Sequence, residues 1–177
     1  VLQNVDFHLG ANFIVDMESS DRHNKVGKTT FLKLIDVALG AKDRKNIYVD
    51  AETNSTERKL ESFIQENKSV VQLTLVDKFE SPQKQYTLQA GLYKAGRYYI
   101  NGDSYNQKEY QQKLNLLLFN NPDKVPSFRK LINSFVRISM SGDTNSFLRN
   151  LPHVSQAEVR GVYNYLFDIS DPNIDKR

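Results

Sequence analysis

The sequence contains no cysteine, which excludes disulfide bonds and thiolate chemistry and suits a reducing cytoplasm, where we expect the protein to act. Proline is scarce, with 5 residues among 177. Hydrophobic and charged fractions of 39% and 25% indicate a folded globular domain instead of a disordered or fibrous chain. A chain of this length can bury a core without metal or disulfide support.

Long apolar runs are also missing. No stretch approaches the roughly 20 apolar residues that cross a bilayer, and the first residues alternate apolar and polar side chains instead of forming a signal peptide. We therefore expect neither secretion nor membrane insertion. His8, His23 and His153 are scattered, without metal-ligand spacing. The net charge of +3 permits phosphate-bearing partners but is too small to indicate nucleic acid by itself.

The first forty residues predict two strands, a loop and a helix. Apolar residues alternate with polar ones over residues 2–9, and the turn pair Gly10-Ala11 leads into a short apolar run at 13–15. A polar segment follows, and after residue 28 the sequence predicts a helix that ends at Gly40. Its apolar positions share one face: Phe31, Leu34, Ile35, Ala38 and Leu39.

The rest of the chain divides into a polar excursion, a meander and helices. Residues 41–68 are expected at the surface, with local order at 47–49 and 60–64. Alternating patterns at 71–75, 86–88, 92–93 and 97–100, with a tight turn at Asn101-Gly102, predict an antiparallel meander. Three amphipathic helices should follow, around residues 110–118 and 128–135 and behind a capping box of Ser155 and Glu158.

The segment between the second strand and the helix has the composition of a phosphate-binding loop. A triphosphate requires backbone N–H donors, a positive helix end and a cation. Gly27 lets the backbone approach the phosphates, Lys28 can reach the β- and γ-phosphates, and Thr29 can offer its hydroxyl to Mg²⁺. Thr30 can donate to an α-phosphate oxygen. The predicted ATP and Mg²⁺ site comprises Asn24, Lys25, Val26, Gly27, Lys28, Thr29 and Thr30.

One position departs from the full fingerprint G-x-x-x-x-G-K-[ST]. Arg22 stands where the first glycine is expected, which implies a differently shaped or longer loop. Short G-K-T runs also occur by chance, and there the glycine is a plain turn and the lysine a solvated residue at the start of a helix. The predicted strand in front and the amphipathic helix behind favour the phosphate-binding interpretation.

The run from Asn24 to Leu32, continuing to Gly40, resembles the start of RecF/SMC-type ABC ATPase heads. It is especially similar to bacterial SMC-like proteins that read N-x-V-G-K-T-T. The opening pattern also resembles theirs, at Leu2, Val5, Phe7, Gly10, Asn12 and Ile14. This resemblance implies an α/β P-loop NTPase fold, with a P-loop and β lobe at 1–105 and a helical lobe at 106–177. It also implies ATP-driven pairing of two heads, a homodimer in the full protein, and DNA as a possible partner.

Other elements of such heads have no convincing match. Residues 70–77 resemble a Walker B strand superficially, but their alternation favours a half-exposed meander strand, and residues 140–143 match only part of the signature. No catalytic residue is assigned. Gln107, Gln111 and Gln112 are interpreted as solvated helix-face residues and not as a γ-phosphate sensor. We expect the chain to be the N-terminal part of a longer head, since it starts at Val1 and shows no stop signal at its end.

Two rival interpretations remain open. The first is a self-contained P-loop kinase or GTPase, although Asn24-Lys25-Val26-Gly27 fails the N-K-x-D base-recognition motif at its fourth place. The second is a non-enzymatic binding module whose loop has lost nucleotide affinity through Arg22. The basic cluster of Lys42, Arg44 and Lys45 could touch a phosphate backbone, but such clusters in polar loops are usually solvated surface.

Overall fold

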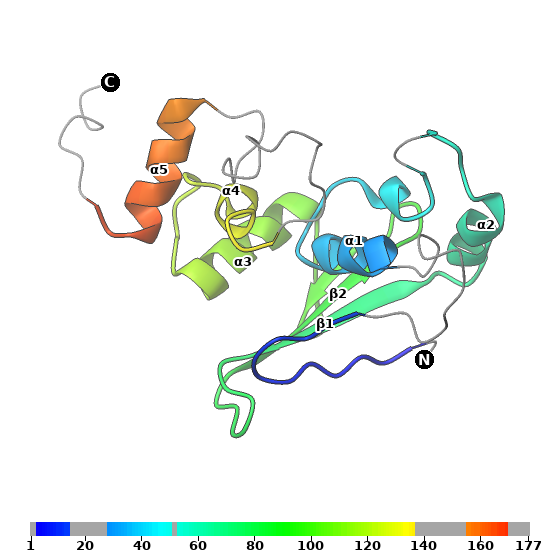
Figure 1. The fold of residues 1–177 in the computed structure, drawn as a ribbon, viewed down its shortest axis with the longest axis horizontal. Helices are drawn as coiled ribbons and strands as arrows, with labels where there is room; N and C mark the ends of the chain where they lie inside the picture. Colours follow the sequence, from blue (N-terminus) through cyan, green and yellow to red (C-terminus); the bar gives the residue numbers. More distant parts are fainter. Residues whose placement is uncertain (1–2, 15–27, 51–52, 137–154, 170–177) are drawn as a thin grey trace.

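The computed structural model describes residues 3–14, 28–50, 53–136 and 155–169. In these residues it shows a mixed α/β architecture, in which one antiparallel sheet lies beneath helix α1 and the later helices extend to one end of the molecule (Figure 1). The expected α/β class is confirmed at this level. None of the described helices is long and apolar enough to cross a membrane.

The sheet is a four-stranded meander. Its strands are β1 (Val70–Val76), β2 (Gln85–Gly91), β3 (Tyr98–Ile100) and β4 (Asp103–Tyr105), each antiparallel to its sequence neighbour. The register places Leu73 opposite Leu88 and Leu88 opposite Ile100, so one face carries apolar side chains into the core. The predicted meander is confirmed, except that residues 92–93 lie in the β2–β3 loop and β4 was not anticipated.

The predicted tight turn joins β3 to β4. Asn101 and Gly102 both have positive φ, 51° and 93°, as a two-residue hairpin turn of the mirror-image type requires. The side chain of Asn101 also accepts a hydrogen bond from the backbone N–H of Thr87, at 2.8 Å. The turn therefore fixes the end of β3 against β2.

Helix α1 (Lys28–Ala38) packs against β1 and β2 and buries its C-terminal part. Behind Gly40, whose φ is 81°, the chain continues into a short 3-10 helix, η2 (Arg44–Ile47), and helix α2 (Arg58–Glu66). The prediction of a surface excursion here was wrong in part. Ile47, Tyr48 and Ile64 are buried, because their side chains pack into the same hydrophobic core as those of the sheet.

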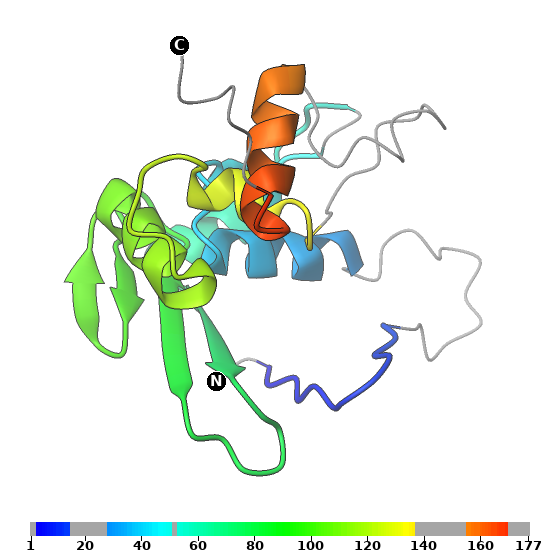
Figure 2. The ribbon, with the colours of Figure 1, turned by 90° about the vertical axis from the view of Figure 1, so that its left-hand side faces the viewer.

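Three helices follow the sheet, as predicted: α3 (Gln107–Phe119), α4 (Phe128–Ile132) and α5 (Gln156–Leu166). Asn106 with Glu109, and Ser155 with Glu158, form capping boxes at α3 and α5. Helix α4 is shorter than expected and leaves Phe135 exposed. In Figure 2 helix α5 lies in front of α4. The buried side chains of Leu131 on α4 and Val162 on α5 form a second small core.

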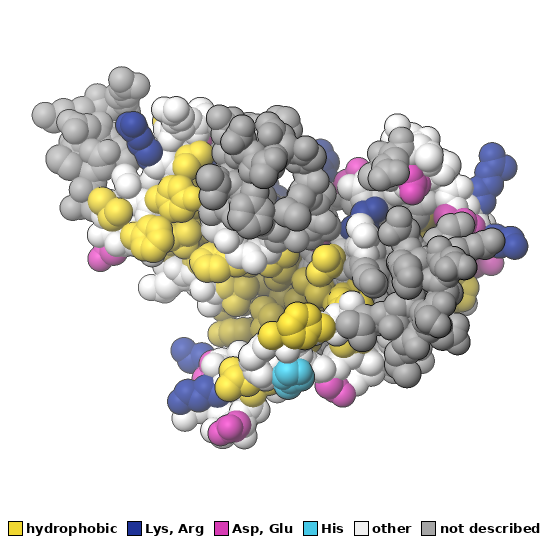
Figure 3. Space-filling model, viewed as in Figure 1, with side chains coloured by type: hydrophobic (Ala, Val, Ile, Leu, Met, Phe, Trp, Pro, Cys, Tyr) yellow, Lys and Arg dark blue, Asp and Glu magenta, His cyan; other side chains and the backbone are white. Residues whose placement is uncertain are grey.

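The two N-terminal strands were predicted wrongly. Residues 3–14 form no strand, although the turn at Gly10 is present, with φ 92° and the side chain of Asn12 donating to the His8 carbonyl. An alternating sequence becomes a strand when a neighbouring edge supplies hydrogen bonds, and no described strand pairs with this segment. Leu9 and Phe13 stay highly exposed, and hydrophobic side chains show at the surface along this part of the molecule (Figure 3).

Candidate phosphate-binding site

The predicted phosphate site lies at the N-terminal end of α1. Asn24, Lys25, Val26 and Gly27 lie outside the described residues, as does the side chain of Lys28. The backbone of Lys28 begins the helix, and Thr29 is exposed while Thr30 is half-buried in the first turn. The helix therefore starts at the lysine of the motif, and the Thr29 side chain is open to solvent.

No acidic side chain occupies the first turn of α1. By contrast, α2, α3 and α5 each carry a glutamate there, at Glu61, Glu109 and Glu158. A carboxylate near a helix N-terminus partly neutralises the positive end of the helix dipole and competes for its free N–H groups. The first turn of α1 has no such competitor, which suits an anionic ligand.

The opposite end of α1 and the residues that follow it are held by side chains from α3 and β3. Tyr110 donates to the Ala38 carbonyl at 2.7 Å, Gln111 to the Gly40 carbonyl at 2.6 Å, and Tyr98 to the Ala41 carbonyl at 2.9 Å. The bond from Tyr110 satisfies a carbonyl that the helix end leaves without an intrahelical partner, and the other two bonds reach carbonyls of the residues that follow the helix. Burial, followed by the neighbouring Tyr98, raises the pKa of Tyr110 above its ordinary value.

The prediction for two of the glutamines was therefore wrong. Gln107 and Gln111 were expected on a solvated helix face, but both are half-buried and both donate to the Gly40 carbonyl. Gln112 is exposed, as predicted. The sequence carries a weak signal for this arrangement, since Gln107 and Gln111 lie four residues apart and share one face of α3.

Helix α4 also reaches α1. The guanidinium of Arg129 lies 2.7 Å from Asp36 in a partly exposed ion pair and donates to the Leu39 carbonyl at 3.3 Å. Together with the bonds from Tyr98, Tyr110 and Gln111, this contact fixes the direction of α1. A fixed helix gives any ligand at its N-terminal end a preorganised partner.

The strand that resembles a Walker B strand has a structural role. β1 is an edge strand of the antiparallel sheet with alternating exposure, as predicted. Asp77 accepts hydrogen bonds from the backbone N–H groups of Gln83 and Lys84, at 2.9 and 3.0 Å. These hydrogen bonds hold the pKa of Asp77 below its ordinary value, and the bond from Lys84 has the largest effect. Asp77 thus closes the β1–β2 loop. Residues 140–143 lie outside the described part of the chain.

The described residues contain no cluster of three or more His, Asp or Glu side chains that could hold a metal ion by themselves. This finding does not bear on Mg²⁺ at Thr29, because such an ion would be held by one hydroxyl together with phosphate oxygens and water.

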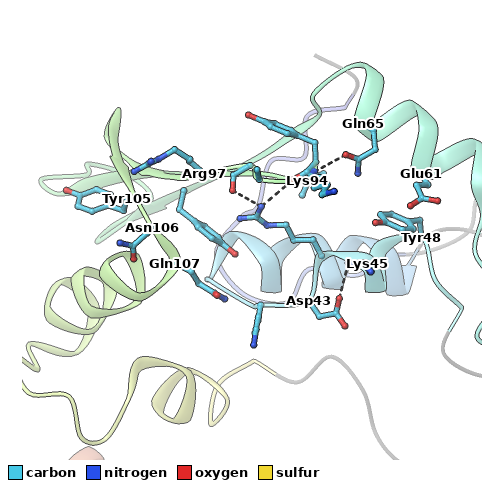
Figure 4. A pocket seen from close by; sticks show the side chains of 17 residues that line it. Asp43, Lys45, Tyr48, Glu61, Gln65, Lys94, Arg97, Tyr105, Asn106 and Gln107 are labelled. Carbon is cyan, nitrogen blue, oxygen red and sulfur yellow. Dashed lines mark hydrogen bonds between the residues drawn. The ribbon is translucent and has the colours of Figure 1, made fainter.

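Sequence reasoning missed a concave site of about 820 Å³, which is lined by residues outside α1. It lies between η2, α2, the β2–β3 loop and the start of α3. Tyr48 and Glu61 lie on one side of it, and Tyr105, Asn106 and Gln107 lie on the other (Figure 4). Arg44, expected to be solvated, is half-buried here. The run of basic residues at 42–45 was the available signal, but its contacts depend on the distant β2–β3 loop.

Comparisons of the chain with protein-family models, with curated proteins and with solved structures gave no match.

Proposed function

We propose that the chain binds a nucleoside triphosphate, ATP with Mg²⁺, at the N-terminal end of α1. In this proposal the backbone of residues 24–27 surrounds the phosphates, Lys28 contacts the β- and γ-phosphates, and Thr29 coordinates Mg²⁺. Thr30 donates to the α-phosphate.

The observation that carries the proposal is the start of α1 at Lys28, directly behind the glycine of the motif. A phosphate-binding loop requires a helix N-terminus at this position, because the free N–H groups of the first turn bind the anion. The exposed Thr29, the first turn without carboxylates and the fixed C-terminal end of the helix all support the same interpretation.

For the full protein we propose an SMC/RecF-like ATPase. The antiparallel meander followed by helices agrees with the lobe that this resemblance implies. ATP would draw two heads together into a homodimer, and hydrolysis at the completed site would release them, with DNA as the substrate on which they act.

A nucleotide titration tests the site. Fluorescent ATP is titrated into the wild-type chain and into Lys28→Ala, with Mg²⁺ present. We expect the substitution to abolish binding and leave the circular dichroism spectrum unchanged, since it removes a charge that serves the ligand. Lys113→Ala, which removes an exposed lysine from α3, is the matched control and should bind like wild type. Equal affinity in wild type and Lys28→Ala would overturn the assignment.

A further inference from the structure

The cavity beside η2 contains an arginine that the fold holds in place. Nη1 of Arg44 donates to the Gly96 carbonyl at 2.7 Å and to the Tyr93 carbonyl at 3.4 Å. The guanidinium carbon also lies 4.6 Å from the ring centre of Tyr98, which stacks in turn on Tyr110. Arg44 is therefore a fixed part of the cavity wall.

These contacts use one nitrogen of the guanidinium. A guanidinium has five N–H donors in a planar fork, and the edge formed by Nε and Nη2 has no hydrogen-bond partner among the described residues. No ion pair joins Arg44 to an acidic residue in that part of the chain. A half-buried cation with unused donors favours an anionic ligand, because burial leaves fewer water molecules to satisfy it.

The cavity concentrates the positive charge of the chain. Five of the 24 Lys and Arg residues line it, against two of the 21 Asp and Glu residues, so 19 of each sign remain elsewhere. The side chains of Lys42, Lys45 and Lys94 have no hydrogen bond or ion pair to described residues. The whole net charge of +3 is thus accounted for by this lining.

The two acidic residues lie toward one side of the cavity. Asp43 accepts a hydrogen bond from the backbone N–H of Lys45 at 3.1 Å. Burial is the main cause that raises the pKa of Tyr48, and the negative charges of Glu61 and Asp43 raise it further. Polar side chains complete the opposite side, where Asn106 and Gln107 lie (Figure 4). The cavity can therefore accept an anionic group at one place and hydroxyl groups at another.

We propose that this cavity binds a small organic phosphate with a hydroxylated body, at a site separate from the N-terminal end of α1. The free Nε and Nη2 edge of Arg44 matches two oxygens of a phosphate, in the geometry that makes Arg–phosphate pairs specific. Lys45 and Lys94 supply additional charge. A volume of about 820 Å³ is within the range of small-molecule sites.

Isothermal titration calorimetry with ribose 5-phosphate tests this proposal in the Lys28→Ala background, which removes the other phosphate site. We expect saturable binding that weakens about tenfold or more in the added double variant Lys45→Ala/Lys94→Ala. Both lysines lack structural contacts through their ammonium groups, so the fold should persist. The matched control Lys84→Ala/Lys113→Ala removes the same charge from exposed positions outside the cavity and should bind as before.

A second variant separates charge from geometry. Arg44→Lys keeps the positive charge but loses the planar guanidinium group. It should weaken the binding of ribose 5-phosphate to a similar extent. Absence of saturable binding, or equal weakening by the two double variants, would overturn the proposal. A parallel titration uses a short 5′-phosphorylated oligothymidylate. If the oligonucleotide bound through the cavity lysines and ribose 5-phosphate did not, the cavity would be a nucleic-acid contact and the proposal would be wrong.

Discussion

The phenolic oxygen of Tyr110 lies 2.7 Å from the carbonyl oxygen of Ala38 and donates its hydrogen to it inside the core. Both residues are fully buried, so no water can replace this bond. The contact links α3 to the end of α1 across 72 positions of the sequence.

Tyr110→Phe should lower the free energy of unfolding by about 1–2 kcal/mol, because it leaves the buried Ala38 carbonyl without a donor. Urea denaturation followed by circular dichroism measures the change. Tyr99→Phe is the matched control, since Tyr99 is half-buried on β3 and its hydroxyl bonds to no described residue. A loss of equal size in both variants would contradict the role given to the Tyr110 hydroxyl.

Two glycine substitutions should change stability in opposite directions. Gly102→Ala should destabilise the chain by about 1 kcal/mol, because φ of 93° strains an L-residue although the space around it is open. Gly161→Ala, inside α5 and also without neighbours within 4 Å, should stabilise it by about 0.5–1 kcal/mol. Thermal unfolding of the two variants measures both effects. A change in stability of the same sign in both variants would contradict either the turn conformation of Gly102 or the helical conformation of Gly161.

The contact between Lys130 and Glu158 should make the docking of α5 depend on pH. The hydrogen bond from Lys130, followed by that from Ser155, lowers the pKa of Glu158 below its ordinary value of 4.5. A lowered folded-state pKa means that the contribution to stability is present above the unfolded-state pKa and is lost as pH falls through the folded-state value.

Hydrogen exchange of α5 amides, measured at neutral pH and below pH 4.5, should therefore show weaker protection in acid. Glu158→Gln should reduce protection at neutral pH and remove this part of the pH dependence. Glu80→Gln, an exposed glutamate in the β1–β2 loop, provides the control and should behave like wild type. An unchanged profile in Glu158→Gln would exclude the ion pair as the cause.

Thr29→Val should weaken ATP binding mainly when Mg²⁺ is present. The substitution removes the hydroxyl that is proposed to coordinate the metal and nearly preserves the side-chain volume. Titrations with fluorescent ATP in Mg²⁺ and in excess chelator measure the two affinities. A loss of the same size under both conditions would argue against Mg²⁺ coordination by Thr29.

We expect the isolated chain to hydrolyse ATP slowly or not at all. Phosphoryl transfer requires a positioned water and charge stabilisation around the γ-phosphate, which can supply several powers of ten in rate. Asp77, the nearest match to a Walker B carboxylate, is engaged in closing a loop. Steady-state assays with Lys28→Ala as the contamination control measure turnover. Robust hydrolysis that disappears in Lys28→Ala would favour a self-contained P-loop enzyme.

The elements that sequence reasoning predicted correctly depend on local signals. Leu34, Ile35 and Ala38 of α1 pack into the core as their spacing predicts, although Val37, outside the predicted face, is buried as well. Ser155 with Glu158 specifies the start of α5. Asn101-Gly102 specifies a turn because few other residue pairs tolerate two positive φ angles. In each case the residues that determine the structure are neighbours in the chain.

The features that could not be predicted depend on distant partners. Val5 and Phe7 alternate as strand residues do, but a strand also needs an adjacent edge, which their own sequence cannot specify. Arg44 is a surface residue by composition, and its burial depends on carbonyls of Tyr93 and Gly96, about fifty positions away. The phosphate-binding interpretation of residues 24–30 came from a motif, and its geometry lies mostly outside the described residues.

The contrast between the meander and the end of α1 has a consequence for folding kinetics. Each strand of the sheet pairs with its sequence neighbour, so these contacts close short loops and can form early. The bonds from Tyr98, Tyr110 and Arg129 to the end of α1 and the residues directly after it span 57, 72 and 90 positions, and closing such loops costs more entropy. We therefore expect the sheet to form in the folding transition state and α1 to dock afterwards. Substitutions at Tyr110 should then accelerate unfolding more than they slow folding, and fixing α1 is the step that completes the proposed phosphate site.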